Sequence, residues 1–223
     1  MILVEQITKK YESLKVVDRF SLEVAHRSSI AITGPSGCGK TTILRLIAGL
    51  EMLDEGKIYI NGNLVSRPGW SLSPSKREIG FVFQSPALWP HMTVAQNILF
   101  GLQGLPGEKA RLRLEDLLAR TSLTGLANRY PHQISGGEAR RVALARALAP
   151  KPRCLLLDEP LTNLDPELKE EMLALIKESL RESEACSIYV THDASEAAYI
   201  SEHVLTLRRG NSSENIKRTI PDV

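Results

Sequence analysis

Short apolar runs, in which hydrophobic and polar residues alternate or cluster, dominate the first third of the chain. Three segments follow this pattern: 2–7, 16–24 and 28–33. In the second of them Phe20, Leu22 and Val24 alternate with polar residues, which places their side chains on one face of a pleated strand. We therefore predict that this part of the chain is rich in strands.

A tight turn is indicated inside the segment 57–65. This segment carries Asn61-Gly62 between apolar residues. Both residue types tolerate the positive φ angles that a two-residue hairpin turn requires. The sequence therefore predicts an antiparallel hairpin over 57–65.

Helical spacing begins at residue 41 and returns through the middle of the chain. Apolar residues recur at i, i+3, i+4 and i+7 in Ile43, Leu46, Ile47 and Leu50, and at helical spacing in Ala110, Leu114, Leu117 and Leu118. A further helix is predicted to start within 94–99. Compact apolar strands are predicted at 153–157 and 187–191, separated by an amphipathic helix over 166–184. Strand, helix and strand in this order predict a parallel sheet covered by helices.

Composition adds mainly exclusions. The 223 residues are 43% hydrophobic and 24% charged, which fits one globular domain and disfavours disordered, collagen-like and coiled-coil classes. A net charge of +2 gives no reason to expect a nucleic-acid partner. Because no apolar run approaches a membrane span and no secretory signal is recognisable, we expect a cytosolic chain. The cysteines at 38, 154 and 186 are expected to be reduced thiols, and the polar tail from 210 to be frayed or loosely docked.

A glycine-rich loop carries the first candidate chemistry. Residues 34–41 read Gly34-Pro35-Ser36-Gly37-Cys38-Gly39-Lys40-Thr41 and match G-x-x-x-x-G-K-[ST] between a predicted strand and a predicted helix. Such a loop turns backbone N–H groups toward one anion, and the helix N-terminus adds partial positive charge. Lys40 would reach the outer phosphates, and the Thr41 hydroxyl would ligate Mg²⁺. The alternative, a glycine-rich turn with a surface lysine, requires all eight positions to agree by accident.

A pair of carboxylates follows the apolar strand 155–157. Asp158 and Glu159 stand where a parallel strand ends, and ligands bind at that edge of open α/β sheets. Asp158 would hold Mg²⁺ through water, and Glu159 would orient and polarise an attacking water molecule. The alternative interpretation is an ordinary acidic loop before Pro160.

A second glycine-rich element, Ile134-Ser135-Gly136-Gly137-Glu138, precedes a predicted helix on which Val142, Ala145 and Ala149 share one face. Ser-x-x-Glu before a helix is a capping box, in which the two side chains bond each other's main-chain N–H groups. The capped N-terminus also offers free amides and positive dipole to an anion. The structural and the anion-binding interpretations can hold together.

Over nearly its entire length the chain resembles the ATP-binding cassette family, the ATPase subunits of ABC transporters. The resemblance implies an α/β fold in which the parallel sheet core of a P-loop NTPase (RecA-like) carries an N-terminal antiparallel β subdomain and an inserted helical subdomain. It also implies a single domain over 1–223. Within that domain, 1–84 and 136–210 form the β subdomain plus the core, 85–135 form the helical subdomain, and 211–223 form the polar tail.

Several residues acquire roles only through this resemblance. Tyr11 stands where the family stacks an aromatic ring on adenine, Gln84 matches the glutamine that senses Mg²⁺ and the γ-phosphate, and His192 matches the switch histidine. By their own chemistry these three would be ordinary strand-end or surface residues. The residues expected to contact ATP are Tyr11, Gly34, Pro35, Ser36, Gly37, Cys38, Gly39, Lys40, Thr41, Thr42, Ser135, Gly136, Gly137 and Glu138. The expected catalytic residues are Glu159, His192, Lys40 and Gln84, and the expected Mg²⁺ ligands are Thr41, Gln84 and Asp158.

The residues Ser135 to Glu138 match the signature motif LSGGQ of the family, but the element departs from the family pattern at two positions. Glu138 stands where Gln is commonest, and Ile134 stands where Leu is commonest. A carboxylate near a phosphate is unfavourable unless something holds it back. We hypothesise that the capping interaction with Ser135 keeps Glu138 at the helix N-terminus.

The resemblance also implies partners. Two cassettes, as a homodimer or a pair of different chains, would face head to tail, with Ser135–Glu138 of one against the γ-phosphate of the other and Leu164-Asp165 crossing the interface. The segment 86–102 resembles the part of importer subunits that receives a membrane permease, with Trp89 and Met92 in a groove or, alternatively, in the core. The stretch 101–114 looks compressed relative to the family. We therefore expect a cytoplasmic protein, peripheral on the inner face of the cell membrane.

Two other functions remain as alternatives to an importer motor. A soluble non-transport ABC ATPase usually carries two cassettes or a long coiled-coil insert, and neither fits in 223 residues. A nucleotide-binding scaffold without turnover is disfavoured because Lys40, Asp158, Glu159 and His192 are all present. The length matches a bare cassette ending near residue 210, so we expect no additional C-terminal regulatory domain. For an importer we expect a small polar solute, ion or vitamin as substrate.

Overall fold

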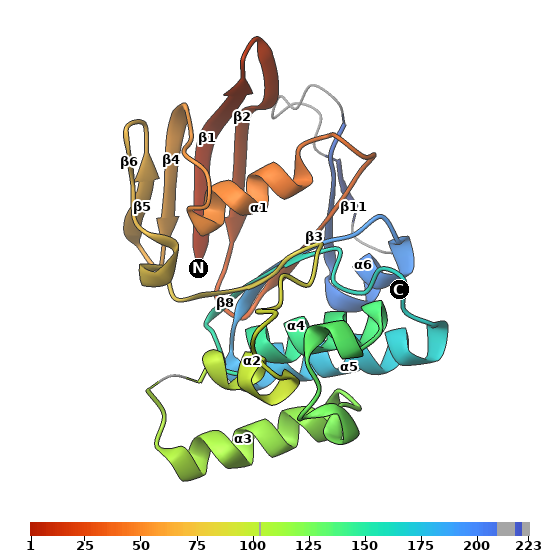
Figure 1. The fold of residues 1–223 in the computed structure, drawn as a ribbon. Coiled ribbons are helices and arrows are strands. Elements are labelled where there is room, and N and C mark those ends of the chain that lie inside the picture. Colours follow the sequence, from red (N-terminus) through yellow and green to blue (C-terminus); the bar gives the residue numbers. More distant parts are fainter. Residues whose placement is uncertain (103, 209–216, 220–223) are drawn as a thin grey trace.

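The fold contains two β-sheets, and helix α1 contacts strands of both (Figure 1). The computed structural model describes residues 1–102, 104–208 and 217–219. The antiparallel sheet has the strand order β2-β1-β4-β5-β6, and the second sheet has the order β11-β10-β3-β9-β8-β7. Every neighbouring pair of the second sheet is parallel except β10 with β11. This mixed α/β architecture is the predicted fold class.

The element bounds are as follows. The antiparallel sheet contains β1 (Ile2–Tyr11), β2 (Leu14–Val24), β4 (Glu55–Ile60), β5 (Asn63–Arg67) and β6 (Trp70–Ser71). The second sheet contains β3 (Ser29–Thr33), β7 (Ile79–Val82), β8 (Cys154–Asp158), β9 (Cys186–Val190), β10 (His203–Thr206) and β11 (Lys217–Thr219). The α-helices are α1 (Lys40–Ala48), α2 (Val94–Phe100), α3 (Gly107–Arg120), α4 (Gly136–Leu148), α5 (Pro166–Ser183) and α6 (Ala194–Ile200).

The parallel sheet separates two hydrophobic cores. Along β8, Cys154 and Leu156 belong to the core that contains α1 and the antiparallel sheet. Leu155 and Leu157 belong to the other core, together with the buried faces of α2, α3, α4 and α5. Because successive side chains of a strand point to opposite faces, one continuous apolar run can serve both cores. This explains why β8 shows no polar alternation in the sequence.

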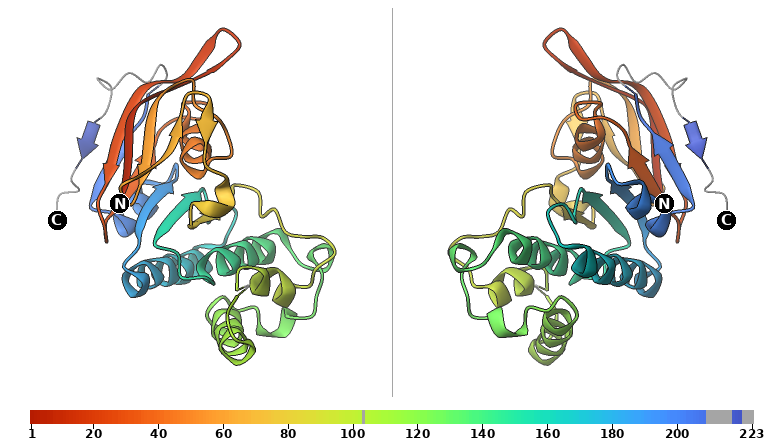
Figure 2. Two further views of the ribbon diagram at one scale, coloured as in Figure 1. Left: turned by 90° about the vertical axis from the view of Figure 1, so that its left-hand side faces the viewer. Right: turned by 90° about the vertical axis from the view of Figure 1, so that its right-hand side faces the viewer.

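The helical part lies beyond the second core. Helix α2 contacts both α3 and α4, and α4 contacts β7. Both views in Figure 2 place α3 farthest from the antiparallel sheet, with α4 and α5 between α3 and the parallel strands. The elements α2 and α3 lie within the predicted helical subdomain, whose bounds of 85 and 135 stay a prediction. No helix in the described ranges is long and apolar enough to cross a bilayer.

The predicted hairpin is confirmed. Strands β4 and β5 pair antiparallel with Ile60 opposite Asn63, so the turn consists of Asn61 and Gly62. Their φ angles are 51° and 80°, in the left-handed region that this turn needs. Here the local sequence alone was sufficient to predict the turn, whereas the strand register shifts between Ile58 and Tyr59.

Part of the C-terminal tail, predicted to be frayed or loosely docked, is docked on the sheet. Lys217–Thr219 pair antiparallel with β10 and add β11 to the edge of the parallel sheet. The rest of the predicted tail, 210–216 and 220–223, lies outside the described residues. Elements as short as β10 and α6 carry too few residues for a periodic signal, and the sequence did not predict them.

Two of the cysteines confirm the prediction of reduced thiols. Cys154 on β8 and Cys186 on β9 are buried and directly opposite in the parallel register. They are free thiols, and the Sγ of Cys186 lies 3.2 Å from the Sγ of Cys154. Both side chains act as small apolar groups in the sheet.

Candidate functional site

The glycine-rich loop connects β3 to the start of α1, as predicted. Gly39 is the N-cap of α1 with a φ of 98°, a left-handed conformation that glycine adopts without steric cost. The side chain of Lys40 is buried, and its Nζ donates to the carbonyl oxygens of Gly34 at 2.7 Å and Pro35 at 3.0 Å. The ammonium group is therefore held by carbonyl oxygens of its own loop. Phosphate oxygens are hydrogen-bond acceptors too, so a bound phosphate could take their place.

The N-terminus of α1 suits an anion. Its first turn contains no acidic residue, and no side chain caps it. The free main-chain N–H groups of that turn carry the positive end of the helix dipole. Together with Lys40 they form the positively charged part of the site.

A pair of oxygen-bearing side chains lies next to this loop. The hydroxyl of Thr41 donates to Oδ1 of Asp158 at 3.2 Å, which joins the start of α1 to the end of β8. Burial raises the pKa of Asp158 above its usual range, an effect that the bond from Thr41 opposes. Hydroxyl and carboxylate oxygens suit Mg²⁺. Since the described residues contain no group of three or more His, Cys, Asp and Glu around one point, such an ion would also need oxygens from a phosphate ligand.

Three polar residues meet where the parallel strands end. Gln84 follows β7, Glu159 follows β8 and His192 follows β9. The Nε2 of Gln84 lies 3.5 Å from Oε2 of Glu159, and Nδ1 of His192 lies 3.7 Å from the same oxygen. The structure thus brings these predicted catalytic residues together at the carboxyl edge of the sheet, where α/β folds bind ligands.

Arg140 on α4 connects to this group and was missed by the sequence interpretation. Its Nη1 donates to the main-chain carbonyl of Gln84 at 2.9 Å and lies 3.5 Å from that of Glu159. Arg146, six residues later on the same helix, donates to the carbonyls of Pro86 and Ala87. No sequence signal could have assigned these contacts, because any residue type carries a main-chain carbonyl.

The predicted capping box at the start of α4 is confirmed. The N–H of Glu138 donates to Oγ of Ser135 at 3.2 Å, and the N–H of Ser135 donates to Oε2 of Glu138 at 2.6 Å. That second bond is the main reason why the pKa of Glu138 is lowered. In the part of the chain described, no hydrogen bond joins Ser135 or Glu138 to Lys40 or Thr41.

Tyr11 lies at the end of β1 beside α1. Its hydroxyl donates to the carboxylate of Glu51, and its side chain is 43% exposed. Burial and the neighbouring Glu51 raise the pKa of Tyr11, whereas a hydrogen bond with Thr42 lowers it. The ring is therefore close to the phosphate loop, but its stacking on adenine stays a prediction.

The loop predicted to cross a dimer interface precedes α5. Asp165 is the N-cap of that helix, and its carboxylate accepts the N–H of Leu168 at 3.0 Å. Leu164 packs against the second core, with its Cδ2 3.3 Å from the point where a Cβ on Gly137 would lie. This places the loop beside the Ser135–Glu138 element of the same chain.

An aromatic patch, formed by Trp89, His91 and Phe100, lies on the helical part. The ring of Trp89 is 45% exposed, 5.8 Å from that of Phe100 and 6.1 Å from that of His91. The buried side chain of Asn97 holds the loop under it by donating to the carbonyls of Trp89, Met92 and Thr93. Trp89 is thus not a core residue, whereas Met92 is half-buried. The role of Trp89 and Met92 in a permease groove stays a prediction.

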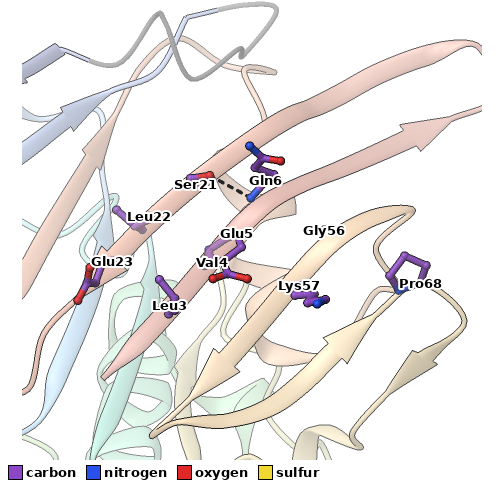
Figure 3. Close-up of a pocket in the computed structure, with 10 residues that line it drawn as sticks. All are labelled: Leu3, Val4, Glu5, Gln6, Ser21, Leu22, Glu23, Gly56, Lys57 and Pro68. Carbon is purple, nitrogen blue, oxygen red and sulfur yellow. Dashed lines mark hydrogen bonds between the residues drawn. The ribbon is translucent and has the colours of Figure 1, made fainter.

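A large hollow lined by described residues lies away from all of these groups. It is about 780 Å³ in volume and lies on the outer face of the antiparallel sheet, next to the bulge where the N–H of Gln6 donates to Oγ of Ser21 (Figure 3). Glu5, Glu23 and Lys57 are exposed there, and none of the predicted site residues lines it. A shallow groove on a sheet is weaker evidence for chemistry than the convergence of polar groups at the strand ends.

Comparisons with known proteins agree with this geometry. Residues 17–162 match the family model described as ABC transporter. The chain is 45% identical, over 92% of its length and 58% of the relative's, to the Fe(3+) ions import ATP-binding protein FbpC of Escherichia coli (strain K12). It is 44% identical, over 94% of its length and 62% of the relative's, to the sulfate/thiosulfate import ATP-binding protein CysA of Thermosynechococcus vestitus. It is 45% identical, over 93% of its length and 56% of the relative's, to the spermidine/putrescine import ATP-binding protein PotA of Hahella chejuensis.

The chain therefore spans only about three fifths of the length of the curated relatives it matches. The similarity to a solved structure extends over nearly the full length of both chains. The dimeric post-hydrolysis state of the ATP-binding cassette MJ0796 bound to ADP and Pi superimposes with a TM-score of 0.86 and 31% identity, over 98% of each chain.

Proposed function

Because this chain belongs to the ABC transporter family, we propose that it binds and hydrolyses ATP as the motor subunit of an importer-type transporter. The observation that carries the proposal is the convergence of two sets of residues at one edge of the parallel sheet. The first set is Lys40 and Thr41, at the phosphate loop. The second set is Gln84, Glu159 and His192, which lie together beside Asp158.

The reaction would be attack of water on the γ-phosphorus, which breaks the bond to the β-phosphate and releases ADP and phosphate. Lys40 would exchange its bonds to the carbonyls of Gly34 and Pro35 for bonds to phosphate oxygens. Glu159 would orient the water and accept its proton, and Gln84 and His192 lie close enough to its carboxylate to hold it in place.

Mg²⁺, when bound, would offset negative charge on the phosphate oxygens, and Thr41 and Asp158 are the residues that would hold it. The bond between these two side chains shows that they already lie on one side of the loop. Gln84 would complete the set from the end of β7.

The Ser135–Glu138 element supports a paired arrangement of cassettes. It has no hydrogen bond to the phosphate-loop residues Lys40 and Thr41 in the described part of its own chain, and its capped helix start presents free amides. In a head-to-tail pair that helix start would face the γ-phosphate bound to the partner. ATP would then be part of the interface, so that its binding favours the closed pair and its hydrolysis favours opening.

A membrane permease is the proposed object of this motion, and the chain would act in the cytoplasm at the inner face of the membrane. The exposed patch of Trp89, His91 and Phe100 supports a protein partner on the helical part. The relatives are named as importers of Fe(3+), of sulfate or thiosulfate, and of spermidine or putrescine. Since these solutes differ even in the sign of their charge, we propose that the permease selects the substrate.

Hydrolysis is tested by measuring phosphate release from ATP with Lys40→Ala beside the wild-type chain. We expect a loss of turnover of at least about 100-fold, as when a preorganised charge is removed from a developing anion. Lys57→Ala, on the outer face of the antiparallel sheet, is the matched control and should keep its activity. Equal turnover in Lys40→Ala and wild type would contradict the proposal.

The transport assignment is tested by purifying the tagged chain from its native membranes. We expect membrane-spanning subunits to accompany it, and we expect Trp89→Glu to lose them. Tyr199→Glu, on α6, is the matched control because its ring is exposed to the same extent, at 44% against 45%. Recovery of soluble partners alone would favour the alternative of a non-transport ABC ATPase.

A further inference from the structure

Arg140 lies on α4, the helix that begins at the Ser135–Glu138 element. Its side chain bonds the main chains of Gln84 and Glu159, two residues of the proposed hydrolytic site. Its Nη1 donates to the carbonyl oxygen of Gln84 at 2.9 Å and to that of Glu159 at 3.5 Å. We propose that Arg140 is a positioning residue that couples the Ser135–Glu138 element of a chain to the Gln84–Glu159 pair of the same chain. The inference rests on the function proposed above.

The carbonyl of Glu159 is a place where positioning is needed. Glu159 has a φ of 47°, a left-handed conformation that a side-chain-bearing residue keeps only when its surroundings hold it. Its N–H donates to the carbonyl of Val190 at 2.9 Å, and its own carbonyl also accepts the hydroxyl of Thr162 at 3.1 Å. The same carbonyl also accepts the N–H of Thr162 at 3.5 Å, and Arg140 adds a donor from α4, a different element of the fold. The peptide groups on both sides of the catalytic carboxylate are therefore held by hydrogen bonds.

The second acceptor of Arg140 belongs to the partner of that carboxylate. The side chain of Gln84 lies 3.5 Å from Oε2 of Glu159. Because one guanidinium nitrogen bonds the main chains of both residues, it holds together the two backbone positions from which their side chains approach each other. A guanidinium keeps its charge at every working pH and its donors point in fixed directions, which suits it to this task.

The coupling follows from where Arg140 lies on α4. It is in the second turn of the helix, and the first turn is closed by the capping box of Ser135 and Glu138. The intervening residues are joined by helix hydrogen bonds, so the two ends of this short segment move together. In the proposed pair, contact of Ser135 with the nucleotide of one site would shift α4 and, through Arg140, the Gln84–Glu159 pair of the other site.

The neighbouring arginines on α4 have different acceptors. Arg141 donates to the carbonyls of Thr121 and Ser122, and Arg146 donates to those of Pro86 and Ala87. Among the three arginines of this helix, only Arg140 bonds the main chain of predicted catalytic residues. The distinction makes a specific test possible.

The experiment compares Arg140→Gln and Arg140→Lys with the wild-type chain. We expect kcat to fall 10- to 100-fold in Arg140→Gln, the size of effect that a small displacement of a reacting group produces. The dissociation constant for ATP should stay within about twofold, and the Hill coefficient for ATP should fall from between one and two toward one. Arg140→Lys, which restores the charge, should recover part of kcat.

The matched control is Arg113→Gln. Arg113 on α3 likewise donates to two main-chain carbonyls, those of Leu148 and Ala149, but at the opposite end of α4. We expect wild-type kcat and an unchanged Hill coefficient. A loss in Arg140→Gln that Arg113→Gln reproduces, or that only follows a drop in melting temperature, would overturn the positioning role.

Amide hydrogen exchange provides a test that does not depend on turnover. Without Arg140, the peptides that contain Gln84 and Glu159 should exchange faster, whereas the antiparallel sheet should be unchanged. Unaltered exchange in those peptides would overturn the inference even if the chain hydrolyses ATP. A wild-type chain without hydrolysis contradicts the proposed function, while faster exchange in Arg140→Gln would still support the contact.

Discussion

Glu138 shows how a single charged side chain can be kept away from the ligand it would repel. Its carboxylate accepts the N–H of Ser135 at 2.6 Å, and this bond lowers its pKa, so the charge is held at the start of α4. A glutamine oxygen can accept the same bond. We therefore expect Glu138→Gln to change ATPase activity by less than about tenfold, or ~1.4 kcal/mol in barrier height.

The measurement is steady-state phosphate release under saturating ATP. Glu138→Ala is the companion variant, since it removes the acceptor of one capping hydrogen bond and should destabilise the chain by about 0.5–1.5 kcal/mol. An increase in turnover well beyond tenfold in Glu138→Gln would mean that the carboxylate reaches the nucleotide, and the capping explanation would then be wrong.

Asp193, next to His192, predicts a pH dependence of stability. It caps α6 by accepting the N–H groups of Ser195 and Glu196, and it pairs with Lys169 at 3.2 Å. Its pKa is lowered to about 2, chiefly by the hydroxyl of Ser195. A lowered carboxyl pKa means that the unfolded chain binds a proton first, so the stabilisation is present above about pH 4 and is lost as the pH falls toward 2.

The test is urea unfolding of the wild type and Asp193→Asn between pH 6 and pH 3. Asparagine keeps the cap but loses the charge, so we expect it to be less stable by about 1 kcal/mol at pH 6 and by progressively less below pH 4. Ser195→Ala removes the hydroxyl that chiefly lowers the pKa of Asp193, so in this variant the stabilisation by Asp193 should be lost at a higher pH. A difference between wild type and Asp193→Asn that stays constant with pH would refute this origin.

Among individual residues, the sequence predicted those that belong to a contiguous motif. Lys40 and Thr41 lie within eight consecutive positions, and Ser135 and Glu138 lie three residues apart. It could not predict Arg140 or Asn97, because their acceptors are main-chain carbonyls brought close by tertiary folding. Such acceptors have no signature in residue type.

Arg77 joins elements that the sequence pattern treats separately. It is buried, and it follows the 3₁₀ turn Pro74–Lys76. Within the described part of the chain its guanidinium donates only to neutral oxygens, and burial lowers its pKa to about 10. The acceptors are the carbonyls of Leu46, Ile47, Val65 and Leu72 and the hydroxyls of Ser66 and Ser71. The carbonyls of Leu46 and Ile47 belong to the last turn of α1, so Arg77 caps the negative end of that helix and ties it to β5 and β6.

Arg77→Lys should therefore lower the free energy of unfolding by about 2–4 kcal/mol. One ammonium group cannot replace a fork that reaches all of these oxygens, and some would remain buried without a donor. Chemical denaturation measures the effect, with Arg67→Lys at the exposed end of β5 as control. A loss below about 0.5 kcal/mol in Arg77→Lys would show that the contacts contribute little.

Whether an element was predicted depended on its length and burial. The long helix α5 shows a full helical pattern and ends at Ser183, with Glu184 in a left-handed conformation, close to the predicted residue 184. Strands β8 and β9 were recognised as apolar blocks. The three residues of β11 are polar, and their strand conformation comes from the free edge of β10 rather than from their own pattern.

The whole molecule places its candidate chemistry where its two cores meet. Strand β8 packs against both cores, and its last residue, Asp158, bonds Thr41 at the start of α1. On the opposite side, Arg140 links Glu159 to α4 and so to the helical part. Contacts through one buried strand and one helix thus link the phosphate loop to the helical part, which bears the exposed aromatic patch. We propose this connection as the route by which ATP binding would act on a permease.

The proposed cycle requires that ATP holds two cassettes together until it is hydrolysed. Glu159→Gln keeps the shape of the site but removes the carboxylate that would accept a proton from water. We expect this variant, with ATP and Mg²⁺, to change from monomer to dimer in light scattering, whereas the wild type returns to monomer as ATP is consumed. Ser135→Arg in the same background should abolish the dimer, because a large side chain would block the helix start.

Light scattering of Glu159→Gln as a function of ATP concentration is thus the decisive experiment. A twofold rise in molar mass that requires both ATP and Ser135 is the predicted result. A variant that remains monomeric at saturating ATP, or that dimerises equally without nucleotide, would contradict the ATP-driven pairing on which the proposed function depends.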